Sequence, residues 1–278
     1  MNMKKFLPFV FLFAVLAVFS ACKKEEDTVP VMITEPTLAE KPTEPATEPP
    51  KEPDRSAEYI YDMYPKFTPV DYSSPAILCE SEPMDEDYIK NTVFLCDSTL
   101  YWLRRNLVEP EQIWTGKEYT QTLAYQSTFK ILDPYDNVER PIREVVELHK
   151  PERMIITLGI NGLSFMSFEE VHDEYLDLVT DIKEISPDTD LILQSILPMS
   201  PDMFRWSNAD VNNEKITKAN AIILDIAEQT GCKYLDTFSV LIDEDGYAKD
   251  ELFNDGLHPS NEGLELIIDY INTHGHIE

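Results

Sequence analysis

Short apolar runs alternate with longer amphipathic segments from about residue 92 to the end of the chain. The runs are continuously apolar rather than alternating with polar residues, which is typical of strands covered on both faces. Alternation of strands and helices predicts a parallel sheet with helices on both of its faces. The predicted strands are residues 92–96, 112–115, 154–158, 191–196 and 233–235.

The segments between these runs have the periodicity of helices. Apolar residues recur at three- and four-residue spacing over residues 168–185 and 212–229, and Gly231 stands where a left-handed cap belongs. A shorter helix is predicted from near Pro141 to His149, and a final one after Ser260. The sequence therefore predicts an α/β fold, a three-layer α/β/α sandwich around a central parallel five-stranded sheet.

The amino terminus has the layout of an export signal. Lys4 and Lys5 precede an apolar run over residues 6–18, and small residues lead to Cys22. The run is short for a membrane-spanning helix, which needs roughly 20 apolar residues, although an uncleaved anchor is an alternative. The end of the segment resembles a bacterial lipobox, with Phe19 in place of the usual Leu. We therefore expect residues 1–22 to be a signal peptide with lipidation at Cys22, and a plainly cleaved signal is the other interpretation.

Residues 23–58 repeat Thr-Glu-Pro and contain few large apolar side chains. Such a composition cannot bury enough surface to offset the entropy of ordering, so a disordered acidic tether is expected there. The folded domain is predicted to span residues 59–278. A lipid anchor followed by a tether would hold this domain outside the cytoplasm, on the bacterial cell membrane, whereas a cleaved signal would make it a secreted protein.

Charge and cysteine usage narrow the classes of partner. The formal net charge is −29, and most of it lies beyond residue 58, so the field of the folded domain repels nucleic acid and other anionic polymers. No CxxC spacing or His/Cys cluster indicates a zinc site, and no metal is expected. Beyond Cys22 the cysteines are Cys79, Cys96 and Cys232, which we expect to be small buried residues rather than a disulfide framework.

The first apolar run ends in Cys96, Asp97 and Ser98, which places two possible nucleophiles side by side. Ligands of parallel α/β sheets bind at the carboxyl ends of the strands, so this turn is a candidate site. We expect a helix to begin here, which would set the Ser98 hydroxyl beside an unpaired backbone N–H. Ser98 could equally be an ordinary helix N-cap.

Two later turns carry further candidates. Asn161 lies between Gly159 and Gly162 after the third run, where its amide could donate to an oxyanion or the segment could be a simple turn. Asp255 precedes His258 by three residues near the end of the chain. Its carboxylate could accept the Nδ1–H of the ring and leave Nε2 as a base, although a surface turn would have the same composition.

Ser98, Asn161 and the Asp255–His258 pair, in this chain order, resemble the blocks of the SGNH (GDSL-type) hydrolase superfamily over about residues 92–272. Cys96 stands where the family has the glycine of Gly-Asp-Ser, and Gly162 stands where it has an acid after the asparagine. The family's second block supplies one glycine, for which Gly116 is the candidate. The resemblance implies the flavodoxin-like SGNH hydrolase fold.

The resemblance also implies a mechanism. Ser98 would be the nucleophile, His258 its base and Asp255 the residue that orients the ring. The oxyanion would be bound by the N–H groups of Ser98 and Gly116 and by the amide of Asn161. The matching order of loops assigns the nucleophile to Ser98 rather than to Cys96. No metal and no organic cofactor would be needed.

The expected activity is a serine esterase that hydrolyses small acyl esters, acetyl groups on carbohydrate above all. The substrate would be an acylated small molecule or polysaccharide, and the protein would be a monomer whose membrane contact is the lipid anchor. An O-acetyltransferase using the same residues and a non-catalytic surface-binding lipoprotein are alternatives. Four aromatic residues could line the site or belong to the core, with core favoured for the first two: Tyr101, Trp102, Phe204 and Trp206.

Overall fold

The computed structural model describes residues 71–117, 130–201 and 211–276. The predicted signal peptide, the lipidation at Cys22 and the predicted tether lie outside these residues, as do Phe204 and Trp206. Within the described ranges, none of the helices combines the length and the apolar character needed to cross a bilayer.

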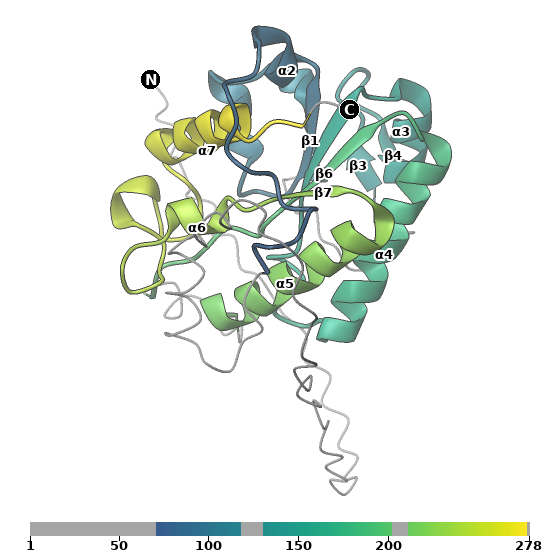
Figure 1. The fold of residues 1–278 in the computed structure, drawn as a ribbon. Coiled ribbons are helices and arrows are strands. Elements are labelled where there is room, and N and C mark those ends of the chain that lie inside the picture. Colours follow the sequence, from purple (N-terminus) through teal and green to yellow (C-terminus); the bar gives the residue numbers. More distant parts are fainter. Residues whose placement is uncertain (1–70, 118–129, 202–210, 277–278) are drawn as a thin grey trace, which may run out of the picture. The chain divides into compact units, whose positions relative to one another are not determined.

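Five parallel strands form the central sheet in the order β2-β1-β5-β6-β7 (Figure 1). Counted along the chain within this sheet, that order is second, first, third, fourth and fifth, which is the doubly wound order of flavodoxin-like folds. The predicted fold class is confirmed, and the predicted runs coincide with the strands to within two residues. The strands are β1 (Thr92–Cys96), β2 (Ile113–Trp114), β5 (Arg153–Thr157), β6 (Asp190–Gln194) and β7 (Lys233–Leu235).

Helices cover both faces of this sheet and make it a three-layer sandwich (Figure 1). One core lies against α3 (Ile142–His149), α4 (Phe168–Ile185) and α5 (Asn213–Thr230). The other core lies against α7 (Asn261–Thr273) and the shorter elements of that face. These shorter elements are α2 (Glu86–Lys90), η1 (Tyr101–Arg105), η2 (Pro110–Gln112), α6 (Phe238–Leu241) and η5 (Asp250–Leu252).

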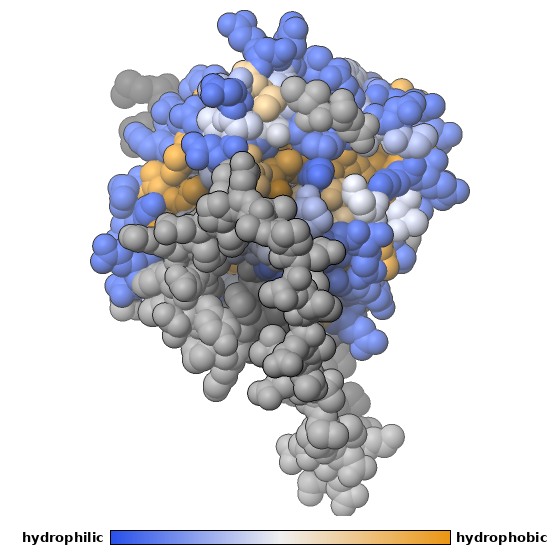
Figure 2. Space-filling view, viewed as in Figure 1, coloured by the Kyte–Doolittle hydropathy of each residue, from blue (hydrophilic) through white to orange (hydrophobic). Residues whose placement is uncertain are grey.

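Local signals in the sequence set the ends of the long helices. Ser167 and Glu170 form a capping box at the start of α4, and Ser260 accepts the N–H of Gly263 at the start of α7. Gly231 ends α5 with φ of 71°, the left-handed conformation expected there. The helices predicted near residues 141–149, over 168–185 and 212–229 and after Ser260 are confirmed. Figure 2 shows hydrophilic residues over much of the displayed face, with hydrophobic residues gathered in a band across it.

The expected helix directly after β1 is wrong. Residues 98–100 form a turn, and only a short 3-10 helix, η1, follows it. The Asp97 carboxylate accepts both the N–H and the hydroxyl of Thr99, and such a local bond offers the backbone an alternative to a helix. Ser98 is therefore no helix N-cap. Tyr101, expected in the core, is buried within η1.

An antiparallel hairpin beside β2 has no counterpart in the prediction. Its strands are β3 (Lys130–Leu132) and β4 (Glu139–Pro141), each three residues long and only partly buried. The N–H of Leu132 donates to the carbonyl of Thr115, which joins the hairpin to the end of β2. Two such short strands give no apolar run, so the pattern that revealed the central sheet could not reveal them.

Candidate active site

Ser98 lies just beyond the carboxyl end of β1, the strand between β2 and β5 in the sheet. Its Oγ is 3.0 Å from Nε2 of His258, which is 160 residues later in the chain. β1 itself is fully buried, because its apolar residues pack on helices of both faces. A rigid buried strand therefore presents the hydroxyl to the ring at the edge where such folds bind ligands.

The Asp255 carboxylate holds the other side of the His258 ring. Its Oδ2 lies 2.8 Å from Nδ1, and its Oδ1 accepts the backbone N–H groups of Leu257 at 3.0 Å and of His258 at 2.8 Å. An ionised carboxylate only accepts hydrogen bonds, so Nδ1 carries the proton and Nε2 has its lone pair toward Ser98. Gly256 makes this tight turn with φ of 82°, a conformation in which a side chain is strained.

The pKa of Asp255 is lowered, so the group is ionised at neutral pH. The largest single effect is partial burial, which raises the pKa. The hydrogen bonds from the backbone and ring of His258 and from the N–H of Leu257, together with the attraction of the ring's charge, outweigh that effect. The site thus keeps a negative charge beside Nδ1 of the ring, and Ser98 lies beside Nε2.

Backbone bonds tie the His258 turn to its surroundings. Asn254 donates its N–H to the carbonyl of His258 at 2.9 Å and its side chain to the carbonyl of Pro259 at 3.0 Å. The N–H of Ser200, in the loop after β6, donates to the carbonyl of Gly256 at 2.8 Å. The base is therefore carried by a turn that is bonded both to itself and to the neighbouring loop.

Two buried asparagines of α5 hold that neighbouring loop, and the sequence interpretation missed both. Asn220 accepts the N–H of Ile196 and donates to its carbonyl, and Asn213 does the same with Met199. Asn213 also donates to the carbonyl of Gly246. The two residues are seven apart, two turns of one helix, and polar residues at that spacing on an otherwise buried face were the available signal.

Gly116 and Asn161 follow the strands on either side of β1. Gly116 is buried and comes two residues after β2, and Asn161 lies in the turn after β5. That turn depends on Gly159, whose φ is 138° and where an added Cβ would meet Ile196 Cδ1 at 2.4 Å. The structure thus places Ser98, Gly116 and Asn161 in the segments that follow three adjacent strands, β1, β2 and β5.

Asp97 is a buried carboxylate next to the candidate nucleophile. Asp97 is 1% exposed, and its Oδ1 accepts the N–H of Thr99 at 2.9 Å and the hydroxyl of Thr99 at 2.7 Å. Burial raises the pKa of Asp97 to about 6, against the lowering effects of these two bonds and of the His258 charge. Asp97 thereby fixes the turn that carries Ser98, at the cost of a buried charge above pH 6.

Asp97→Asn should raise the free energy of unfolding at pH 8 and change it little at pH 4. Between pH 4 and 6 the Asp97 carboxyl is protonated in the native state to a greater extent than in the unfolded chain. The free energy of unfolding of the wild type therefore falls as pH rises through that window. An amide oxygen can accept the same two bonds from Thr99 without titrating. A shift of about two pKa units sets an upper limit of about 3 kcal/mol on the gain.

Urea unfolding of both proteins at the two pH values measures this difference. If the difference in the free energy of unfolding between Asp97→Asn and wild type is the same at pH 4 and pH 8, the assignment of a buried charge to Asp97 is contradicted.

Cys96 lacks the properties of a nucleophile. Its side chain is fully buried, and burial, followed by the negative charge of Asp97, raises the pKa of the thiol well above its usual value. Cys232 is buried as expected, whereas Cys79 is exposed, so the expectation of three buried cysteines is wrong at that position. The described part of the chain contains no group of three or more His, Cys, Asp or Glu residues that could hold a metal ion.

Comparison with known proteins adds to this geometry. Solved structures with the same fold include a Streptococcus pneumonia protein described as a platelet activating factor, at 18% identity, TM-score 0.51 and coverage of 78% of this chain and 91% of that one. A Bacteroides fragilis protein assigned as an acylhydrolase matches at 18% identity and TM-score 0.49, over 70% of this chain and 88% of that one. A GDSL-like lipase of Bacteroides thetaiotaomicron matches at 16% identity and TM-score 0.45, over 78% of this chain and 96% of that one.

A search of curated proteins finds no match. A family model, described as the GDSL-like Lipase/Acylhydrolase family, matches residues 132–266. The matched segment includes Asn161, Asp255 and His258, and Ser98 lies before it in the chain, in the turn that follows β1. Residues 132–266 of this chain are thus similar to the GDSL-like lipase/acylhydrolase family.

Proposed function

We propose that this protein is a serine esterase in which Ser98, His258 and Asp255 form the catalytic triad. The observation that carries the proposal is the continuous chain of contacts from Ser98 Oγ to His258 Nε2, and from His258 Nδ1 to Asp255 Oδ2. The family consists of acylhydrolases, and an activated hydroxyl beside a correctly oriented imidazole is the equipment that acyl transfer to water requires.

In the first half of the reaction, Ser98 Oγ bonds to the ester carbonyl carbon while its proton passes to His258 Nε2. Collapse of the tetrahedral intermediate breaks the bond to the leaving alcohol, which takes that proton. In the second half, water attacks the acyl-enzyme, gives its proton to His258 and releases the acid, and the proton returns to Ser98. Asp255 stabilises the imidazolium that forms in both halves.

The oxyanion of each intermediate would be bound by the N–H groups of Ser98 and Gly116 and the side-chain amide of Asn161. The position of Gly116 and Asn161 on the strands that flank β1 supports this assignment. Removal of one such donor lowers turnover by about 100- to 1000-fold in enzymes of this kind.

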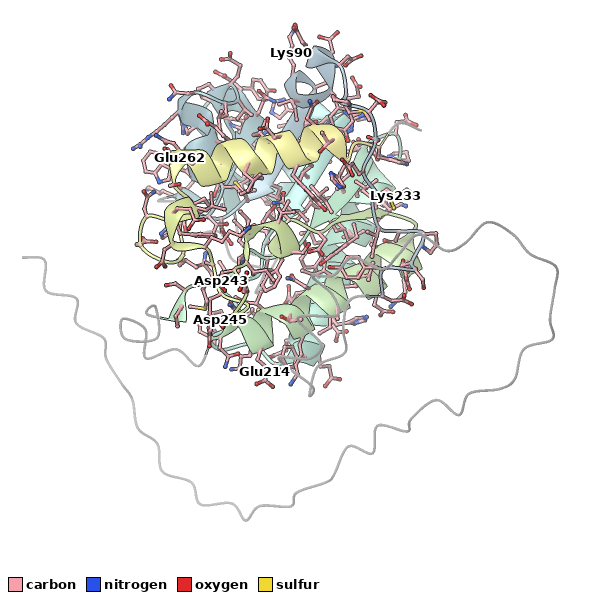
Figure 3. The ribbon with its side chains drawn as sticks, turned by 60° about the vertical axis from the view of Figure 1, so that its left-hand side comes forward. Lys90, Glu214, Lys233, Asp243, Asp245 and Glu262 are labelled. Carbon is pink, nitrogen blue, oxygen red and sulfur yellow. The ribbon has the colours of Figure 1, made fainter. Side chains whose placement is uncertain are left out.

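The proposed substrate is an uncharged acyl ester, with acetyl groups on carbohydrate as the leading class. The surface around the His258 turn supports an uncharged substrate because it is acidic. Glu251 and Glu262 are exposed on the elements before and after this turn. Asp243 and Asp245 are exposed in a neighbouring turn (Figure 3). Asn213 donates a hydrogen bond to the carbonyl of Gly246 in that turn. Such a field disfavours anionic headgroups and polymers.

A panel of esters tests the proposed substrate class. We expect hydrolysis of aryl acetates and acetylated neutral glycans, with kcat/KM falling as the acyl chain lengthens and as phosphate or carboxylate is added to the leaving group. Phospholipid hydrolysis at rates equal to acetate release would contradict the proposed class. Acetate transfer to a glycan in preference to water would replace the hydrolase with a transferase.

A further inference from the structure

One lateral row of residues crosses the whole sheet where the strands end. Cys96 pairs with Thr157, and Gln194 pairs with Leu235. The pairs Leu95–Trp114 and Ile156–Leu193 are one residue earlier, so Thr115 lies level with Cys96, and Gln194 lies level with Thr157. We call this set the terminal row, and it consists of Thr115, Cys96, Thr157, Gln194 and Leu235.

Residues that are paired across parallel strands point to the same face of the sheet. Cys96 and Leu235 belong to the core that includes Leu264 and Ile267 of α7, so the terminal row faces α7. The three polar members are almost fully enclosed: Thr115 is 7% exposed, Thr157 2% and Gln194 0%. The row thus places hydroxyl and amide groups inside the protein, in the last layer before the loops that carry the candidate site.

Three oxygen atoms of this row make no hydrogen bond. Among the described residues only four buried side-chain nitrogen or oxygen atoms lack a partner, and three of them are Thr115 Oγ1, Thr157 Oγ1 and Gln194 Oε1. Unpaired buried polar atoms are uncommon because each carries the full cost of desolvation. Thr157 and Gln194 are on the adjacent strands β5 and β6, so their two unpaired oxygens can share one partner, whereas Thr115 is separated from them by Cys96 of β1.

The spacing of Thr157 and Gln194 fits a particular partner. Neighbouring strands are about 4.8 Å apart, which is too far for a direct bond between side chains that stand parallel and close to the distance that one water spans with two hydrogen bonds. Gln194 Nε2 already donates to Thr237 Oγ1 at 2.9 Å, which fixes the amide plane and leaves the oxygen as the unpaired atom. If the amide oxygen and nitrogen of Gln194 were exchanged, the nitrogen would be the unpaired atom, and one of the two would still lack a partner.

We propose that an ordered water molecule bridges Thr157 Oγ1 and Gln194 Oε1 within the terminal row. It donates to the amide oxygen, and its second bond is to the threonine hydroxyl, in an enclosed polar setting of the kind that retains buried water. The water joins β5 and β6 where their loops leave the sheet, next to the turn that carries Asn161. This site is independent of the proposed esterase activity and holds whether or not Ser98 is the nucleophile.

A high-resolution crystal structure of the full chain tests the site directly. The proposal predicts an electron-density peak at hydrogen-bonding distance from both oxygens. Thr157→Val, which keeps the shape of the side chain and removes the hydroxyl, should lose the peak, and Thr157→Ser should retain it. A wild-type structure without the peak, or an undisplaced peak in folded Thr157→Val, would overturn the proposal.

A double-mutant cycle tests the same link in solution, without crystals. If the water couples the two residues, Thr157→Val and Gln194→Met each lower the urea midpoint of unfolding, and the double variant lowers it by less than the sum of the two. Additive shifts would show that no shared partner connects the side chains. Circular dichroism of each variant at zero urea confirms that the comparison is made between folded proteins.

Discussion

Ser98→Ala is expected to lower kcat/KM for a small aryl acetate by about 10,000-fold or more. Without Oγ no acyl-enzyme can form, and only the residual catalysis of the binding site remains. The fold should persist, because the contact of Ser98 Oγ with His258 Nε2 joins two loops and is not part of the core. Steady-state kinetics, together with a urea midpoint close to that of wild type, measure both parts of this expectation.

Ser164→Ala is the matched control. Ser164 is an exposed serine in the turn after Asn161, and its removal changes the same atoms at a surface position. Wild-type kinetics are expected for it. Folded Ser98→Ala protein with more than a few per cent of wild-type turnover would rule out Ser98 as the nucleophile, and the assignment of the whole site would fall with it.

Asp255→Asn is expected to lower kcat by about 100- to 10,000-fold, with much less change in KM. An amide at this position can present its N–H groups to Nδ1, which places the ring proton on Nε2 and removes the base that Ser98 needs. It also removes the negative charge that stabilises the imidazolium. The Asp255 side chain is 53% exposed, so water can replace part of its effect, which is why the expected range is wide.

The control for this change is Asp269→Asn. Asp269 is an exposed residue of α7, and its substitution removes one negative charge at a position outside the His258 turn. It should leave kcat within about twofold of wild type. Equal losses in the two variants would mean that the general acidic field of the surface, rather than the contact with His258, accounts for the effect of Asp255.

The central sheet could be predicted because its signal is strong and local. Strands buried on both faces are continuously apolar, and β1 has this pattern from Thr92 to Cys96. The helix ends could be predicted because Ser167, Gly231 and Ser260 each act on the backbone within a few residues. Where one residue decides a local conformation through its own side chain or its own φ, the sequence suffices.

The turn after β1 shows where this reasoning stops. Asp97 could have accepted bonds from the first turn of a helix or from Thr99 alone, and the pattern of residues is the same for both. The choice depends on the packing of the loops around it. The hairpin of β3 and β4 escaped for a related reason, because its attachment to Thr115 is a tertiary bond between two short segments.

The residues of the candidate site could be predicted better than the residues that hold its loops in place. Ser98, His258 and Asp255 were selected by their order and their place after strands, and the structure brings these three into contact. The roles of Gly116 and Asn161 as oxyanion donors stay predictions. Asn213 and Asn220 were not selected, because their seven-residue spacing on the apolar face of a helix shows burial but not the loop that their side chains bind.

Labelling with a fluorophosphonate, followed by mass spectrometry of the digested protein, tests the central claim most directly. The reagent phosphonylates an activated serine with loss of fluoride, and it should modify native protein once, on the peptide that contains Ser98. Prior unfolding and Ser98→Ala should each abolish the adduct. An active native protein that carries no adduct, or carries it on a residue other than Ser98, would contradict the account.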